Sequence, residues 1–376
     1  MEGFFFFSFK MYGIFVYCSL ILSATAWVRD MENPNLYQGD MILSPSEIEE
    51  VQNGTFKFSA LGDLSKMWPN AVVPYVIDSS LANERKAKSG IESAIADYHK
   101  YTCLRFKLRT NEAEYIRFWR GSGCSSYVGY TKGRRNDVSL SEGCWSKSTV
   151  LHEVGHSLGF HHEQTRPDRD SFVTIVKSNI SPGTYFNFEK ENARDINSHG
   201  SPYDYLSMMH YSWNAFAVNT GSPSIITLNK EYQYHIGQDE GFSRSDVIQL
   251  NKMYRCSGSY PTPPDYVIVP GCHNTGGACA SGVAEGNCNK PEWKSYMTRA
   301  CRRACGLCGD GGGPKTDGPV VTYTAGPNTT PPRTPVPPTI GGACVDKHVN
   351  CIQFRNDCNQ HPDYFKMYCR KTCKFC

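Results

Sequence analysis

One histidine-rich segment constrains this 376-residue chain more than any other feature. Residues 152–162 read HEVGHSLGFHH, which has the spacing H-E-x-x-H-x-x-G-x-x-H. On a helix, positions four apart share a face, so His152 and His156 point their imidazoles at one site, with Glu153 beside them. The segment therefore predicts a helix that carries a metal site.

Gly159 and His162 complete the predicted site. A glycine three residues after His156 can adopt a positive φ, which turns the chain and brings His162 to the same point. Three nitrogen ligands leave one position open, as in catalytic rather than structural zinc sites. Zinc there would activate water and polarise a carbonyl group, while Glu153 would take the water's proton and pass it to a leaving amine. We interpret His161, one position out of register, as an ordinary loop histidine.

The cysteines indicate export, because seventeen are far more than a reducing compartment normally holds. The apolar run 11–22, followed by Ala-Thr-Ala, is typical of a secretory signal (1–26) cleaved after Ala26. Cleavage would remove Cys18 and leave sixteen of the seventeen, an even number. A membrane anchor is the alternative, but Lys10 splits the apolar residues into runs shorter than the roughly 20 that span a bilayer. Translation that starts at Met11 would give a more typical secretory signal sequence.

Charge and hydropathy limit the possible partners. Thirty-nine basic and 36 acidic residues give a net charge of +3, with no long basic run, so no nucleic-acid partner is expected. No later segment is apolar enough to anchor the chain in a membrane.

Glycosylation sequons begin at Asn53, Asn179 and Asn328.

The region before the motif predicts a mixed α and β domain. From about Trp27 to the late fifties the chain is polar, without a sustained helix or strand period, which indicates a pro-segment (27–59). Strands are predicted at 71–77, 104–108 and 115–119, and a helix at 81–100. A Gly- and Ser-rich loop with Cys124 and Cys144 then leads to the motif helix.

The motif and its surroundings resemble the astacin family of metzincins. The run 152–163 is followed by SMMHY at 207–211, and the match spans about residues 60 to 256. This resemblance implies an α+β catalytic domain over 60–257, with a twisted, mostly parallel sheet and an active-site helix, and the activity of a zinc endopeptidase. It also implies that Met209 forms a turn beneath the metal. Tyr211 would be a displaceable ligand that helps to stabilise the transition state.

The resemblance extends to a device for latency. Residues 37–40, YQGD, resemble the F-x-G-D segment through which pro-peptides of this family place an aspartate on zinc, so Asp40 would displace the catalytic water. Tyr37 replaces the usual phenylalanine, and the alternative for Asp40 is a turn residue after glycine. Maturation in this family buries a new N-terminus near the glutamate after the third histidine, here Glu163. That terminus would lie near residues 59–60.

The C-terminal region contains an internal repeat. Two six-cysteine clusters, 271–308 and 344–376, both end in C-x-x-x-C-x-x-C and flank a Gly-, Pro- and Thr-rich linker at 309–343. Modules of under about 40 residues need disulfides in place of a core. Both clusters resemble the ShK toxin-type domain.

The two resemblances together imply a set of disulfides. The expected pairs are Cys103 with Cys256, Cys124 with Cys144, Cys272 with Cys308, Cys279 with Cys301, Cys288 with Cys305, Cys344 with Cys376, Cys351 with Cys369, and Cys358 with Cys373.

The modules also supply a rival hypothesis, a secreted channel-blocking or adhesion protein. Blocking members of the ShK type use an adjacent Lys-Tyr pair, but Asp363 precedes Tyr364 and Ser295 precedes Tyr296 here. An acid at the position of the pore-plugging lysine argues against channel block, and docking to matrix or cell surfaces is the other interpretation of the modules. We therefore expect a secreted, latent zinc endopeptidase that acts on extracellular proteins or peptides.

Overall fold

The computed structural model describes residues 33, 36–52, 64–191, 198–219, 221–268, 272–274, 279–308 and 321–322. Several sequence predictions lie outside these residues: the signal, the new terminus at 59–60, the linker except for residues 321–322, and the second cysteine module with its three disulfides. Among the described helices, none combines the length and the apolarity needed to cross a bilayer.

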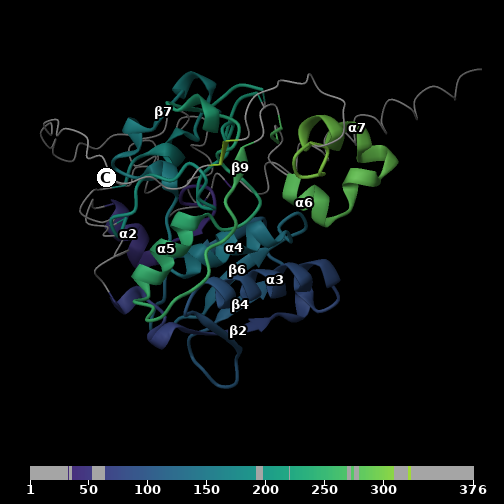
Figure 1. The fold of residues 1–376 in the computed structure, drawn as a ribbon. Helices are drawn as coiled ribbons and strands as arrows, with labels where there is room; N and C mark the ends of the chain where they lie inside the picture. Colours follow the sequence, from purple (N-terminus) through teal and green to yellow (C-terminus); the bar gives the residue numbers. More distant parts are fainter. Residues whose placement is uncertain are drawn as a thin grey trace, which may run out of the picture.

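The predicted catalytic domain contains a six-stranded sheet, and its strands β2, β4 and β6 lie in the lower half of Figure 1. In spatial order the strands are β1 (Met41–Ile42), β5 (Cys124–Tyr127), β6 (Asn136–Leu140), β4 (Ile116–Trp119), β2 (Val72–Ile77) and β3 (Arg105–Leu108). Neighbouring strands run parallel, except that β5 and β6 are antiparallel. The predicted α+β class with a mostly parallel sheet is confirmed.

The loop predicted between β4 and the motif helix was partly wrong, because it contains β5 and β6. Their sequences, CSSY and NDVSL, carry too many polar residues to show a strand pattern. The strand conformation comes from pairing on both sides of β6, and the buried side-chain amide of Asn136 donates from Nδ2 to the Gly129 carbonyl at 2.7 Å. The disulfide Cys124–Cys144 ties β5 to the segment that precedes the motif helix.

Two helices, α3 (Arg85–Tyr101) and α4 (Lys147–Ser157), pack against each other and cover the sheet. α3 buries one apolar stripe, which consists of Ala87, Ile91, Ala94, Ile95 and Tyr98. α4 begins at Ser146, whose hydroxyl accepts a hydrogen bond from the Thr149 amide. In Figure 1, α4 lies between the sheet and the part of the domain that contains β7.

The chain after α4 builds a second core with little regular structure. The strands β7 (Val173–Ile175) and β8 (Ile225–Thr227) pair antiparallel, and their apolar residues pack with Phe188, Tyr211 and Trp213. Helix α5 (Arg244–Met253) then returns to the first core, and the disulfide Cys103–Cys256 ties its end to the end of α3. Short 3-10 helices complete the domain: η1 (Leu64–Lys66), η2 (Pro69–Ala71), η3 (Ser79–Leu81), η4 (Glu163–Thr165), η5 (Arg169–Ser171), η6 (Lys177–Asn179), η7 (Tyr185–Phe188) and η8 (Lys230–Tyr232).

The first cysteine module contains α6 (Cys279–Ala284), η9 (Asn287–Asn289) and α7 (Pro291–Ala300). Its disulfides join Cys272 to Cys308, Cys279 to Cys301 and Cys288 to Cys305, which are the pairs that the resemblance implies. Arg303 of this module pairs with Glu240 of the catalytic domain and lies over the ring of Tyr266. Beside it, β9 (Val267–Ile268) pairs antiparallel with β10 (Val321–Thr322).

The predicted pro-segment (27–59) has regular structure that the sequence reasoning missed. β1 adds a parallel edge strand to β5, and α2 (Pro45–Gln52) follows it. The Ser44 amide donates to Glu47 at 2.7 Å and the Glu47 amide donates to the Ser44 hydroxyl at 3.3 Å, which is a capping box. The Ser-x-x-Glu spacing was a usable signal for this helix start, whereas a two-residue strand has none.

Candidate metal centre

Three imidazoles converge beside the end of α4. Nε2 of His152 lies 3.2 Å from Nε2 of His156 and 3.3 Å from Nε2 of His162. His152 and His156 occupy one face of α4, one turn apart, as their spacing requires. His162 reaches the same point because Gly159, with φ at 110°, turns the chain after the helix.

The hydrogen bonds at Nδ1 orient the three rings toward a common ion. His152 faces the Met208 carbonyl at 2.8 Å, His156 faces the Phe160 carbonyl at 2.9 Å, and His162 faces Oε1 of Gln38 at 3.0 Å. A carbonyl oxygen can only accept, so each Nδ1 carries hydrogen and, in the neutral ring, each Nε2 presents a lone pair. Three lone pairs aimed at one buried point are the donor set of a zinc site.

Asp40, in the predicted pro-segment, completes this donor set. Its carboxylate lies 3.1 Å from Nε2 of His152, 3.2 Å from that of His162 and 3.4 Å from that of His156, and the four donors lie within 4.8 Å of one another. Burial raises the pKa of Asp40, but His162, His156 and His152 outweigh this effect and the net pKa lies well below its usual range. Oδ1 accepts no hydrogen bond among the described residues. The residues present therefore fit a cation.

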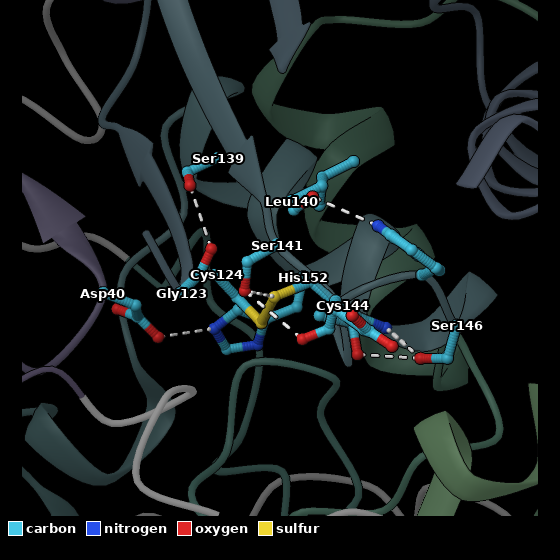
Figure 2. Close-up of a disulfide and its surroundings, with 12 residues drawn as sticks. Asp40, Gly123, Cys124, Ser139, Leu140, Ser141, Cys144, Ser146 and His152 are labelled. Atoms are coloured by element: carbon cyan, nitrogen blue, oxygen red, sulfur yellow. Dashed lines mark hydrogen bonds and ion pairs between the residues drawn. A yellow bond between two sulfur atoms is a disulfide. The ribbon is translucent and has the colours of Figure 1, made fainter. Parts of the chain in front are cut away.

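Figure 2 shows the side chain of Asp40 pointing at His152. It also shows the Cys124–Cys144 disulfide and the Ser146 cap of α4. Asp40 ends the turn that precedes β1, and its carbonyl accepts from the Ser126 amide of β5 at 2.9 Å. The sheet edge therefore sets the position of this carboxylate.

Glu153 lies beside the histidines with a side chain suited to proton transfer. Only 2% of the residue is exposed, and Oε2 accepts no hydrogen bond among the residues that the structure describes. Burial raises the pKa of Glu153 well above its usual value, and the nearby Asp40 charge raises it further. A carboxyl group with a raised pKa holds a proton more readily than an ordinary carboxyl group, which suits Glu153 to proton transfer.

A turn formed by residues 207–209 packs against the motif helix α4. A Cβ on Gly155 would lie 3.0 Å from Sδ of Met209, so the turn packs directly on α4. Asp246 of α5 holds this turn, since it accepts from the Ser207 hydroxyl at 2.7 Å and from the Met208 amide at 2.9 Å. Burial raises the pKa of Asp246 to about 7. Sequence reasoning missed Asp246, because nothing in the chain shows which residue its carboxylate faces.

Tyr211 lies beside His162 at the metal centre. Its ring centroid is 4.6 Å from that of His162, and its hydroxyl donates to the Gln38 carbonyl of the pro-segment. The backbone amide of Tyr211 donates to Oε1 of Gln164 at 3.0 Å, which holds the backbone of Tyr211 in place. Neither Gln38 nor Gln164 was singled out from the sequence.

Glu163 faces away from the imidazoles. It accepts from Arg166 at 3.1 Å and from the Asp204 amide at 2.7 Å. Burial raises the pKa of Glu163 to about 8, although Arg166 opposes the increase. Glu163 is therefore a buried carboxylate next to the metal loop but outside the group of metal donors.

Residues 60–255 match the model of the peptidase family described as Astacin. The chain belongs to the astacin family. Its catalytic domain is that of a zinc metalloendopeptidase, as the sequence predicted. Residues 271–308 and 343–376 match the family described as ShK domain-like.

The share of this chain that can be aligned differs from one relative to another. Zinc metalloproteinase nas-15 of Caenorhabditis elegans is 31% identical over 93% of this chain and 70% of its own length. Meprin A subunit beta of Mus musculus is 41% identical over 60% of this chain and 30% of its own length. The structure of High choriolytic enzyme 1, a hatching enzyme zinc-protease from Oryzias latipes, is 38% identical and covers 52% of this chain and 98% of its own, with a TM-score of 0.48. The chain spans less than half of several other curated astacins that it matches.

Proposed function

We propose that this protein is a secreted endopeptidase, made as a latent precursor in which Asp40 occupies the zinc site. The observation that carries the proposal is the approach of one pro-segment carboxylate to within 3.4 Å of all three Nε2 atoms. A carboxylate in this place excludes the substrate and its water from the metal. Removal of the pro-segment is therefore the activating step.

The mature enzyme uses its own residues for distinct parts of peptide hydrolysis. His152, His156 and His162 hold zinc, which supplies Lewis acidity to the scissile carbonyl and to water. Glu153 takes a proton from the attacking water and returns it to the leaving amine. The hydroxyl of Tyr211 donates to the carbonyl oxygen of the reacting peptide as negative charge develops there. The contact of this hydroxyl with the Gln38 carbonyl supports that role.

Activation also involves Glu163. Cleavage near residues 59–60 releases an amino group, and we assign Glu163 as its buried partner. The carboxylate already lies beside the metal loop, where Arg166 and the Asp204 amide bind it. A new ammonium group in this pocket would favour the charged form of Glu163.

We infer an extracellular location from the export signal and the ShK modules. Cleavage after Ala26 yields the secreted chain, and the disulfides of the described residues are consistent with an oxidising compartment. We assign the modules at 271–308 and 344–376 a docking role on matrix or cell surfaces, close to extracellular protein substrates. The ion pair between Arg303 and Glu240 supports a first module held beside the catalytic domain.

The test is digestion of denatured casein by the full-length chain before and after limited proteolysis with elastase, which is then inhibited. We expect activity only after processing, and we expect a zinc chelator and the Glu153→Ala substitution each to abolish it. A folded, zinc-loaded and processed chain that cleaves no peptide bond would refute the enzymatic assignment. Cleavage that persists in Glu153→Ala would instead mean that another residue is the base.

A further inference from the structure

Glu191 lies beside the metal centre, where the pro-segment contacts it directly. Oε1 of Glu191 accepts a hydrogen bond from the Tyr37 hydroxyl at 2.8 Å and another from Nε2 of Gln38 at 2.5 Å. Only 8% of the residue is exposed. Its backbone amide donates to the Thr165 carbonyl at 2.7 Å, three residues after His162. The carboxylate is therefore tied to the metal-binding loop through its own backbone.

Gln38 links this carboxylate to the metal centre. Its Oε1 faces Nδ1 of His162 at 3.0 Å, while its Nε2 donates to Glu191. Two residues further on, Asp40 lies among the three Nε2 atoms. The side chain at position 38 thus fills a space between a zinc-binding histidine and a buried carboxylate. In the latent chain the pro-segment occupies this space in place of a substrate.

Tyr37 supplies the second donor. A phenylalanine at this position, as in the F-x-G-D pattern, would have no hydroxyl for Glu191. Oε1 of Glu191 therefore accepts hydrogen bonds from two side chains of the pro-segment, Tyr37 and Gln38. Both leave when the pro-segment is removed.

We propose that Glu191 is a specificity-determining residue of the mature enzyme, and that it accepts a lysine or arginine side chain of the substrate in the space that Gln38 fills. This inference rests on the proposed function. A cation gives a charge-assisted hydrogen bond, which is about twice as strong as a neutral one. An apolar side chain in this space would form no hydrogen bond with Glu191 in the place of Tyr37 and Gln38. The geometry thus points to substrates with a basic residue at one fixed position relative to the scissile bond.

A peptide library tests this assignment. The full-length chain, processed with elastase that is then inhibited, is given a library randomised on both sides of the scissile bond, and cleavage products are sequenced by mass spectrometry. We expect lysine and arginine to be enriched at one position. For matched peptides with lysine or methionine at that position, kcat/KM should favour lysine roughly ten-fold. Processed Glu153→Ala reports any cleavage by residual elastase.

Two variants assign the preference to this carboxylate. Glu191→Gln keeps the shape of the side chain. It should bring the ratio of kcat/KM for the lysine peptide to kcat/KM for the methionine peptide close to one. Glu189→Gln removes the same charge from an exposed neighbour and should leave the ratio unchanged. An unchanged ratio in Glu191→Gln overturns the inference. A wild-type profile without basic residues at any position also overturns it, even if Glu191→Gln fails to fold.

These outcomes separate the inference from the proposed function. Chelator-sensitive cleavage without a basic preference leaves the peptidase assignment intact and removes the role of Glu191. No chelator-sensitive cleavage of any library member removes the peptidase assignment itself.

Discussion

Oδ2 of Asp40 lies 3.1 Å from Nε2 of His152, so the last residue of the YQGD segment reaches the first histidine of the metal motif across 112 positions of sequence. This contact places an anionic pro-segment ligand inside the metal centre. In the latent precursor that we propose, this one carboxylate blocks the metal centre, and the effect of its removal can be measured.

Asp40→Ala should weaken latency. Without the carboxylate, the pro-segment loses its contact with the metal donors, and we expect the unprocessed chain to gain at least about ten-fold in casein hydrolysis. Glu49→Ala is the matched control, because it removes an exposed acid from α2 of the same pro-segment. Equal activity of the two unprocessed variants would show that Asp40 does not maintain latency.

Glu153→Gln should abolish turnover while zinc remains bound. The substitution keeps the shape of a buried side chain but removes the proton acceptor, and general-base catalysis typically contributes about 10²–10⁴-fold. Because Glu153 is outside the four-donor group, zinc content measured by atomic absorption should match that of the wild type. Loss of zinc together with activity would indicate that Glu153 supports the site instead of the reaction.

Acid should weaken docking of the pro-segment through Glu47. Burial raises the pKa of this residue, but the hydrogen bonds from Lys66 and Ser44 outweigh it, and the net pKa lies below 4.5. A lowered folded-state pKa means that the stabilisation is present above the unfolded value and is lost as pH falls through the folded value. We therefore expect wild type to protect its pro-segment amides from hydrogen exchange more than Glu47→Gln does at pH 6, and the difference to shrink progressively as the pH falls below 4.5. A difference that stays constant with pH would exclude ionisation of Glu47 as the cause.

Gly90→Ala should destabilise the catalytic domain. A Cβ at this position would lie 2.2 Å from the carbonyl oxygen of Trp145, just before the cap of α4. Since the Trp145 carbonyl belongs to packed backbone that cannot move aside easily, we expect a loss of about 1–3 kcal/mol in the free energy of unfolding, measured in urea. Gly221→Ala is the control, because its Cβ would meet no atom within 4 Å. If the two variants unfold at the same urea concentration, α3 and α4 do not pack as closely as the structure shows.

The sequence alone determined the family, the identity of the metal as zinc and the fold class, because each depends on the spacing of residues within short segments of the chain. The run 152–162 specifies a helix and a turn, and an i, i+4 pair of histidines shares a helix face in any protein. The same reasoning located β2, β3, β4 and α3 within a few residues, since each has a clear apolar pattern. Strands β5 and β6 and the pro-segment elements did not show such a pattern.

The tertiary structure decided which distant side chains meet. Asp246 reaches Met208 over 38 positions, Gln38 reaches His162 over 124, and Gln38 reaches Glu191 over 153. None of these pairs has a sequence spacing that predicts contact, because each depends on how the second core and the pro-segment close around α4. Chemistry carried by one helix is therefore readable from sequence. The hydrogen bonds that orient it, and the contact of Gln38 with Glu191, follow only from long-range packing.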